Sequence, residues 1–296
     1  MKVILDTGLS LVVVLMMASV GMDMEQQHFR TLARRKAALT LTLATQFVVL
    51  PALGFLLTQS LALPPHISAG ILLLAACPVG DIANFYVLLA RANLALSVTV
   101  NSISILLSAA TMAIAFEAYE HLLREPFVFA LPTTALIVRL ILMLGLPVLG
   151  GMMIRRLWPQ QVKRFRGSLH KAFLAGIVCL SAAIMFAQRD RLASEWRQTA
   201  FAAALFIGLA LLGGIVFGRL ARFSREDTFT VSIGFAVRNV ALAMTIAVTL
   251  LNRIEYAVFV VVFFLTEVPL LLGVVVIYRQ WWAPAAKHAQ ATGDFL

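Results

Sequence analysis

Two short polar clusters, each set inside a long apolar run, hold the residues of this sequence that could bind an ion or a charged substrate. The first cluster covers residues 77–84 (CPVGDIAN) and the second covers residues 232–239 (SIGFAVRN). A guanidinium can hold a carboxylate or sulfonate through two parallel hydrogen bonds, and carboxylate and amide oxygens can hold a hard cation. A carboxyl group in apolar surroundings can take up a proton. Each cluster offers one charged residue and one amide: Asp81 with Asn84, and Arg238 with Asn239.

The composition indicates what kind of elements must position these clusters. The chain has 296 residues, of which 61% are apolar and 13% charged, and its mean hydropathy is +0.93. A soluble domain carries about a quarter charged residues. The sequence therefore excludes a water-soluble enzyme and predicts an all-α polytopic membrane protein. The formal charge of +10 lies in short clusters between apolar runs, which favours contact with the bilayer surface and not with nucleic acid.

Nine apolar segments are long enough to cross a bilayer, for which a helix needs roughly 20 mostly apolar residues. They are residues 3–22, 37–61, 67–90, 95–116, 133–154, 172–188, 199–218, 228–251 and 256–278. The longest connection, residues 155–171, is basic, and we expect it to be a solvated loop at the membrane surface.

The distribution of Lys and Arg predicts the orientation of these spans. With the N-terminus outside, sixteen of the 24 basic residues lie in segments that face the cytoplasm and six lie outside. Positively charged loops stay in the cytoplasm. We therefore expect a multi-pass protein of a bacterial-type plasma membrane, with an outside N-terminus and a cytoplasmic tail at residues 283–296. The basic cluster 30–36 predicts that the first span is kept and not cleaved as a signal peptide.

Both polar clusters are predicted to interrupt a membrane-spanning helix. Pro78 removes a hydrogen-bond donor and Gly80 permits unusual dihedral angles, while the second cluster brings Gly234 and Arg238 to a similar depth. Broken backbone survives at mid-membrane only against protein or a wet cavity. Two broken segments at corresponding places in two halves of a chain are typical of an inverted-repeat transporter.

At these residues the chain resembles the bile acid:sodium symporter family of secondary transporters. Residues 77–84 are similar to that family's CPGGTASN, and residues 89–97 (LARANLALS) are similar to its LARGNxALS. Residues 235–243 lie where the family has a segment beginning EVGMQN. Weaker similarities are found at residues 21–24 and 46–51.

The resemblance implies a nine-helix version of the family's fold in one membrane domain covering residues 1–296. A core, mainly residues 37–116 and 199–278, would contain the two crossing broken helices, and a panel would consist mainly of residues 3–22 and 133–188. The family carries organic anions by alternating access together with sodium. No resident cofactor is implied, only Na⁺ or H⁺ as the coupling ion, with a small organic anion and the lipid bilayer as partners. The oligomeric state is left open.

The residues that match the family's sodium ligands depart from its pattern. The positions of the first ion read Ala83, Asn84, Ser97, Asn101 and Gly234. Those of the second ion read Gln46, which is retained, Gly234 and Arg238. A hard cation prefers a carboxylate ligand, and the carboxylate shared by the two sites is lost. We therefore predict degraded sodium sites, with the Arg238 guanidinium in the place of the second ion.

A charge at this depth also needs a partner. Asp81 and, in the ninth span, Glu267 are the candidate partners of Arg238. The pair could be a static ion pair, Arg238 could bind a substrate anion, or Asp81 or Glu267 could carry a coupling proton. The predicted substrate-binding residues are Asp81, Asn84, Arg238 and Asn239, and the predicted ion- or proton-coupling residues are Gln46, Ser97, Asn101 and Glu267.

Two other function classes remain open at this point. A Cys in a broken helix, here Cys77, is also compatible with a metalloid or anion exporter of a related fold. A sensor or scaffold that keeps the fold without transport is the third alternative.

Overall fold

The computed structural model describes residues 14–15, 17–19, 21–22, 36–123, 138 and 141–282. All named elements within this part of the chain are helical, and one isolated β-bridge joins two of the connections. The predicted tail 283–296, most of the first span and the start of the fifth span lie outside the described residues.

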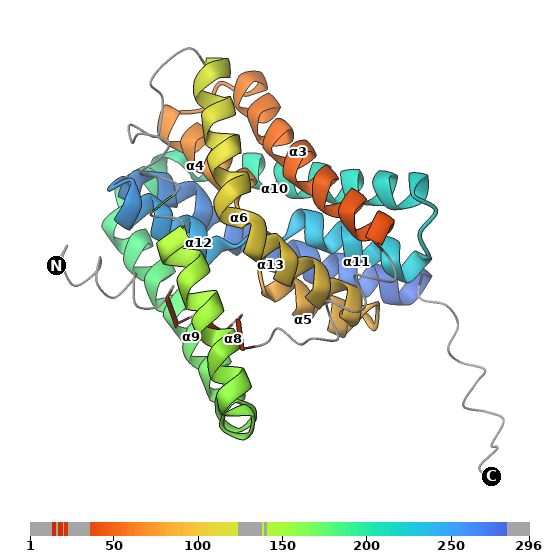
Figure 1. Ribbon diagram of the computed structural model, residues 1–296. Coiled ribbons are helices and arrows are strands. Elements are labelled where there is room, and N and C mark those ends of the chain that lie inside the picture. Colours follow the sequence, from red (N-terminus) through yellow and green to blue (C-terminus); the bar gives the residue numbers. More distant parts are fainter. Residues whose placement is uncertain are drawn as a thin grey trace, which may run out of the picture.

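The helices begin and end close to most of the predicted spans. In chain order they are α3 (Lys36–Ser60), α4 (Pro65–Ala76), α5 (Ile82–Ala90), α6 (Leu94–Leu123), η1 (Ile141–Gly145), α8 (Leu146–Leu157), α9 (Pro159–Ala187), α10 (Arg189–Leu220), α11 (Arg225–Ala236), α12 (Val240–Thr245), η2 (Ile246–Leu250), η3 (Ile254–Tyr256), α13 (Ala257–Ile277) and η4 (Tyr278–Trp282) (Figure 1).

The lengths of these helices fit a protein that works inside a bilayer. Four segments of the described chain are long and apolar enough to cross a membrane: Leu39–Ser60, Leu94–Leu123, Arg189–Leu220 and Ile254–Trp281. Large apolar side chains lie on the outer surface, among them Val48, Ile114 and Phe186. Such a surface is unfavourable in water and favourable against lipid. The all-α membrane class predicted from the sequence is thus supported.

The prediction of a loop at residues 155–171 is wrong. Residues Leu146–Leu157 form α8, and α9 begins at Pro159, which occupies the first turn of that helix. The chain therefore turns at Trp158 and stays helical through the basic cluster (Figure 1). Charge alone does not end a helix, because Lys and Arg are good helix formers, and Pro is well tolerated at a helix start.

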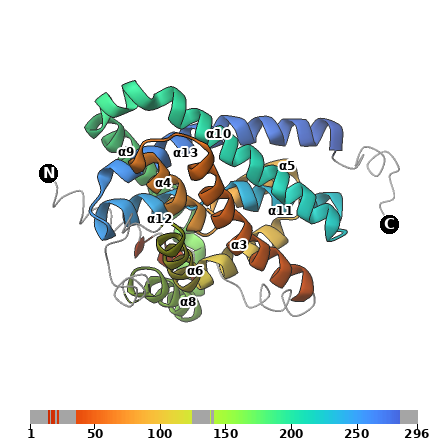
Figure 2. The ribbon, with the colours of Figure 1, turned by 90° about the horizontal axis from the view of Figure 1, so that it is seen from above.

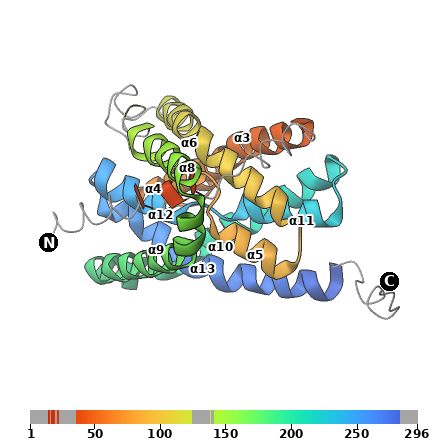
Figure 3. The ribbon, with the colours of Figure 1, turned by 60° about the horizontal axis from the view of Figure 1, so that its bottom comes forward.

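The two predicted breaks are both present. The third predicted span consists of α4 and α5 with a non-helical segment between them, and the eighth consists of α11 and α12 with a second non-helical segment. Figures 2 and 3 both place α4 and α12 on one side of the structure and α5 and α11 on the other. The two broken segments therefore run in opposite directions and cross between their halves.

The half-helices form the centre of the protein. Every residue of α4 from Ile67 to Ala76 is buried, and so is every residue of α11 from Thr228 to Ala236. Their surroundings include α3, α6, α10 and α13, which bury them from all sides. A helix that is apolar all round belongs in such a position, and this packing keeps lipid away from the exposed backbone groups of the breaks.

Candidate substrate and ion site

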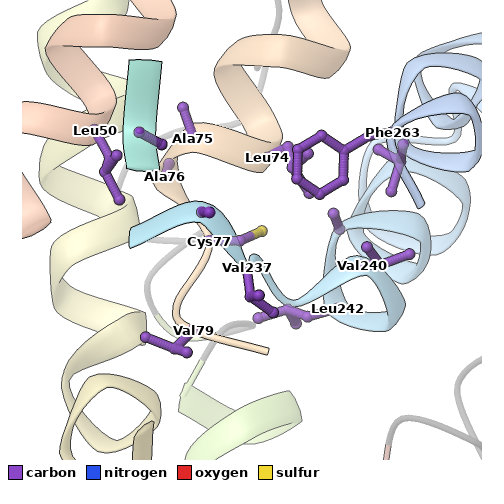
Figure 4. Packing of buried hydrophobic residues seen from close by; sticks show 14 of the residues in the cluster. Leu50, Leu74, Ala75, Ala76, Cys77, Val79, Val237, Val240, Leu242 and Phe263 are labelled. Atoms are coloured by element: carbon purple, nitrogen blue, oxygen red, sulfur yellow. The ribbon is translucent and has the colours of Figure 1, made fainter. Parts of the chain in front are cut away.

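The two breaks meet through their backbones. Val79 and Arg238 form an antiparallel β-bridge. The Asn239 amide donates to the Pro78 carbonyl at 2.9 Å, and the Gly80 amide donates to the Val237 carbonyl at 3.4 Å. Figure 4 shows the side chains of Cys77, Val79 and Val237 packed around this crossing. Each unwound segment thus satisfies backbone groups of the other, which a break inside a membrane protein requires.

Gly80 is required here for close approach and not for its dihedral freedom. A Cβ atom at Gly80 would lie 2.6 Å from the Arg238 carbonyl oxygen. No glycine in the described part of the chain has a positive φ, so the expectation of unusual dihedral angles at Gly80 is wrong. The backbone of the second break occupies the space that a side chain would need.

We expect Gly80→Ala to separate the two breaks. Overpacking a close contact costs about 1–3 kcal/mol, and here the neighbour is backbone, which cannot rotate away. The variant should show a lower melting temperature in detergent and strongly reduced transport. Gly234→Ala is the matched control, because a Cβ at Gly234 meets nothing within 4 Å. Equal melting temperatures of the two variants would contradict this account of the crossing.

Helix α6 supplies polar side chains along one face toward the crossing. The Ser104 hydroxyl accepts a hydrogen bond from the Val79 amide at 3.2 Å. Ser97, Asn101 and Ser108 are also buried on α6. Their spacing of four, three and four residues from Ser97 to Ser108 places them on one side of a helix, so this stripe was visible in the sequence. Ser104 was nevertheless missed as a residue of the site.

Arg238 is buried at the crossing with a solvent exposure of 1%. One terminal nitrogen, Nη2, donates to the Cys77 carbonyl oxygen. The other guanidinium nitrogens, Nε and Nη1, have no hydrogen-bond partner among the described residues. A buried donor without a partner costs about 1–3 kcal/mol. The guanidinium is therefore held by one hydrogen bond from Nη2, and its Nε and Nη1 donors can bind an acceptor such as a substrate anion.

The expected pairing of Arg238 with Asp81 is not seen among the described contacts. The Asp81 carboxylate accepts instead from the Asn101 amide, Nδ2 to Oδ1, at 2.6 Å. Asn84 likewise accepts from the Ser97 hydroxyl at 2.7 Å. These contacts bring all four of those predicted site residues into two pairs between α6 and the start of α5.

Glu267, the other candidate partner, lies in the middle of α13 and is fully buried. Neither of its carboxyl oxygens has a hydrogen-bond partner among the described residues. Glu267 and Arg238 interact electrostatically, although no ion pair within 4 Å joins them in the described part of the chain. The Tyr86 hydroxyl, which also interacts with Glu267, is buried without a partner as well. Arg238, Glu267 and Tyr86 thus each keep buried polar atoms without a partner among the described residues.

Asn239 ends the second break by capping α12. Its side-chain oxygen accepts from the Leu242 amide at 3.0 Å, and its Nδ2 has no partner among the described residues. Asn is among the preferred residues at a helix N-cap. A structural role of Asn239 therefore accompanies the predicted role in binding.

Gln46, which matches the position of a sodium ligand in the family, lies at a separate small cavity. Its Nε2 donates to the Gly234 carbonyl oxygen at 3.0 Å, while its Oε1 has no partner among the described residues. The cavity has a volume of about 10 Å³, which is close to the space of one water molecule. Its lining comprises Thr42, Gln46, Val79, Ser97, Val100, Thr230, Val231, Gly234 and Phe235.

The guanidinium of Arg238 is not part of this cavity lining. Its described hydrogen bond goes to the carbonyl oxygen of Cys77, which does not line the cavity either. These contacts do not support the prediction that the guanidinium fills the seat of the second sodium ion. The open side of Gly234, at the position where the family has its carboxylate, faces that cavity instead. Ala83 is fully buried and offers no oxygen from its side chain.

No group of three or more His, Cys, Asp or Glu side chains that could hold a metal ion occurs among the residues that the structure describes. Cys77 is buried at the crossing (Figure 4). Its carbonyl oxygen, and not its thiol, makes the contact with Arg238. The geometry therefore gives no specific support to a thiol-based metalloid site.

Comparison with known proteins gives the family. Residues 10–195 match the model of the sodium bile acid symporter family, and this match ends before the second break. The chain is 24% identical over 235 residues to the uncharacterized sodium-dependent transporter YocS of Bacillus subtilis, covering 79% of this chain and 71% of YocS.

Two relatives from other kingdoms are similar over less of their length. The ileal sodium/bile acid cotransporter of Oryctolagus cuniculus is 25% identical over 188 residues, which cover 63% of this chain and 54% of the relative. The probable sodium/metabolite cotransporter BASS1, chloroplastic, of Arabidopsis thaliana is 25% identical over 232 residues, 78% of this chain and 56% of the relative. The chain thus spans about half the length of these two proteins. With a matching family model and two crossing broken helices of the kind that transporters use, the chain belongs to the sodium bile acid symporter family, whose members are transporters and not enzymes.

Proposed function

We propose that this protein is a secondary transporter of small or amphipathic organic anions that works by alternating access with weak or absent sodium coupling. The observation that carries the proposal is the buried Arg238 at the crossing, whose Nε and Nη1 have no hydrogen-bond partner among the described residues. A guanidinium matches the planar oxygens of a carboxylate or sulfonate. The names of the relatives, which include a bile acid and a metabolite cotransporter, support an organic anion as the substrate.

The proposed architecture has nine spans with an N-terminus outside and a cytoplasmic C-terminus in a bacterial-type plasma membrane. The core consists mainly of residues 37–116 and 199–278, and the panel mainly of residues 3–22 and 133–188. The opposite directions of the two broken segments support an inverted repeat. In such a repeat, rocking of the core against the panel would open the crossing alternately to each side.

Weak sodium coupling follows from the groups around Gln46. The cavity beside Gly234 offers amide and hydroxyl oxygens but no carboxylate, and sodium is a hard cation that prefers charged oxygen ligands. The hydroxyl of Ser97 donates its hydrogen to Asn84 and offers only a neutral oxygen to a cation. Neutral oxygens without a carboxylate would hold a monovalent cation only weakly.

A proton is the alternative coupling ion, with Glu267 as its carrier. A carboxylate without partners in an apolar interior is costly, and protonation removes that cost. When Glu267 is protonated, the positive charge of Arg238 is available to a substrate anion. Anion and proton would then enter together.

Uptake into proteoliposomes tests the proposed function. Radiolabelled taurocholate and pyruvate serve as probes, each under no gradient, an inward sodium gradient and an inward proton gradient. We expect saturable uptake of at least one probe, with less than about twofold stimulation by sodium. Strong stimulation of uptake by sodium would contradict the proposal of weak sodium coupling but would still support transport of an organic anion. Stimulation by the proton gradient that Glu267→Gln removes would assign the proton to Glu267.

Binding of a probe without any flux in all three conditions would contradict transport and favour the sensor or scaffold. Binding is measured separately, by the thermal shift of the purified protein with each probe. Increased arsenite resistance of cells that express the protein, lost in Cys77→Ala, would favour the metalloid exporter.

A further inference from the structure

A second polar site lies at the turn between α10 and α11, next to the end of α13. None of its residues belongs to either break. It is an open pocket of about 390 Å³, lined by Arg219, Phe223, Arg225, Thr228 and Trp281. Neither the family resemblance nor the proposed transport cycle uses any of these five side chains. Two arginines, a hydroxyl residue and two aromatic rings around one hollow are a suitable set for an anion with an apolar body.

The pocket is built on rigid elements. A Cβ atom at Gly218 would lie 2.7 Å from the Thr228 side chain, and one at Gly214 would lie 2.5 Å from the Ser232 Cα. Helices α10 and α11 therefore pack at nearly backbone distance just beneath the pocket. The turn between them is closed by a hydrogen bond from the Phe223 amide to the Gly218 carbonyl at 2.9 Å. Arg219 and Arg225 are thus fixed on the two sides of a short turn.

The end of α13, which contributes Trp281 to the pocket, packs against α11. The ring of Tyr278 stacks on Phe229 of α11, with ring centroids 3.9 Å apart and an interplanar angle of 29°. Trp281 follows Tyr278 within the same helical turn, η4. The stacking holds the end of α13 against α11 and so places the Trp281 indole beside the two arginines.

The charged side chains among the five that line the pocket are both positive. Arg225 begins α11, whose Ser224 caps the helix by accepting from the Asp227 amide at 3.0 Å. The N-terminus of a twelve-residue helix adds a partial positive charge. Two acidic residues follow in that first turn, Glu226 and Asp227, and Asp227 accepts from the Asn93 amide at 2.7 Å. Neither lines the pocket.

The position of the pocket relative to the bilayer indicates the source of its anion. Two of the four segments of the described chain that are able to span a membrane end beside it, one at Leu220 and the other at Trp281. The ends of spanning helices lie where the hydrocarbon meets the polar headgroups, and Trp is enriched at that level. Basic pockets between helices at this level bind lipid headgroups. The geometry points to a binding site for the phosphate of an anionic phospholipid, held by Arg219 and Arg225 with Trp281 against the glycerol and upper acyl region.

Native mass spectrometry of the detergent-purified protein tests this site. The probes are dioleoylphosphatidylglycerol, dioleoylphosphatidylcholine and inorganic phosphate. We expect phosphatidylglycerol to bind in preference to phosphatidylcholine. The double variant Arg219→Gln/Arg225→Gln should reduce the apparent affinity for phosphatidylglycerol about tenfold or more, since each basic residue near an anionic surface contributes roughly a factor of five. Arg222→Gln is the matched control, because Arg222 lies in the same turn but does not line the pocket.

Three outcomes are informative. An equal loss in the Arg222 control and the double variant would reduce the effect to general surface charge and overturn the site. Equal binding of the two lipids would overturn the preference for an anionic headgroup. If inorganic phosphate stabilises the wild type but not the double variant, and phosphatidylglycerol binds both equally, the ligand is a free phosphate and the lipid assignment is wrong. A melting curve of each variant, compared with that of the wild type, checks that the fold is intact.

Discussion

Gly234→Glu is expected to make transport depend on sodium. An added Cβ at this position meets nothing within 4 Å, and the residue lines the small cavity beside Gln46. The new carboxylate would join the Gln46 Oε1, which has no partner among the described residues, and the nearby hydroxyl of Ser97. Carboxylate, amide and hydroxyl oxygens together form a hard-cation site. We expect about tenfold stimulation of uptake by an inward sodium gradient, or about 1.4 kcal/mol of coupling free energy.

Gly234→Gln is the control for this variant, because glutamine has the same shape without the charge. It should leave uptake independent of sodium. Binding of sodium itself is measured by the thermal shift of the two purified variants in sodium and in choline chloride. If Gly234→Glu folds, as judged by its melting curve, and shows no more sodium response than Gly234→Gln, the lost carboxylate is not the reason for weak coupling.

Arg238→Gln is expected to abolish transport of anions almost completely. The side chain is buried at the crossing, and its charge is the one that the proposed substrate site relies on. Removing one partner of a buried charge-assisted contact costs about 2–5 kcal/mol, so uptake at low substrate concentration should fall about 100-fold. Gln is the residue that the family pattern has at this position, and it can keep a polar contact near the Cys77 carbonyl.

Two controls separate a loss of binding from a loss of folding. Arg238→Lys keeps the charge but not the fork of donors, and we expect intermediate uptake. Arg253→Gln removes an arginine that is 61% exposed and paired with Glu255 at 3.4 Å, and it should transport normally. Normal uptake by Arg238→Gln would mean that the guanidinium only joins the two breaks. A lost thermal shift with taurocholate or pyruvate, at an unchanged melting temperature without probe, would assign Arg238 to the substrate.

The double variant Gly234→Glu/Arg238→Gln combines the two effects. It restores the carboxylate and the amide of the family's pattern at both positions. If Arg238 replaces the electrostatic role of a bound cation, this variant should regain uptake only in the presence of sodium. The response of the double variant would then exceed the sum of the responses of the single variants, as expected for residues of one network.

Much of the architecture was determined by the sequence itself. The long apolar runs predicted spans that agree with α3, α6 and α13, because the cost of exposing polar backbone in lipid requires helices of that length. Pro78 with Gly80, and the polar cluster around Arg238, predicted the two breaks. Local rules suffice for these features, since each depends on residues that are neighbours in the chain.

The partners of the buried polar groups were decided by the tertiary structure. The sequence suggested Asp81 or Glu267 for Arg238, whereas the described hydrogen bond goes to the Cys77 carbonyl, and Asp81 accepts from Asn101. Which of two carboxylates meets a guanidinium depends on how the breaks cross and on how far each side chain reaches. The local sequence pattern predicts neither the crossing geometry nor the reach of the side chains, because residues more than 150 positions apart meet at the crossing.

The room for a side chain at each glycine and the ends of the helices also depend on more than the local sequence. The sequence does not distinguish Gly234 from Gly80. In the structure the backbone of the second break leaves no space for a side chain at Gly80, whereas a Cβ atom at Gly234 meets nothing within 4 Å. The basic residues after Trp158 predict a loop by their charge, but they form a helix because Lys and Arg are good helix formers. The sequence alone thus determined the long apolar helices α3, α6 and α13 and the positions of the two breaks, through the transfer cost of each segment. Only the folded structure decided which polar atoms are left without partners, because that depends on contacts between segments far apart in the chain.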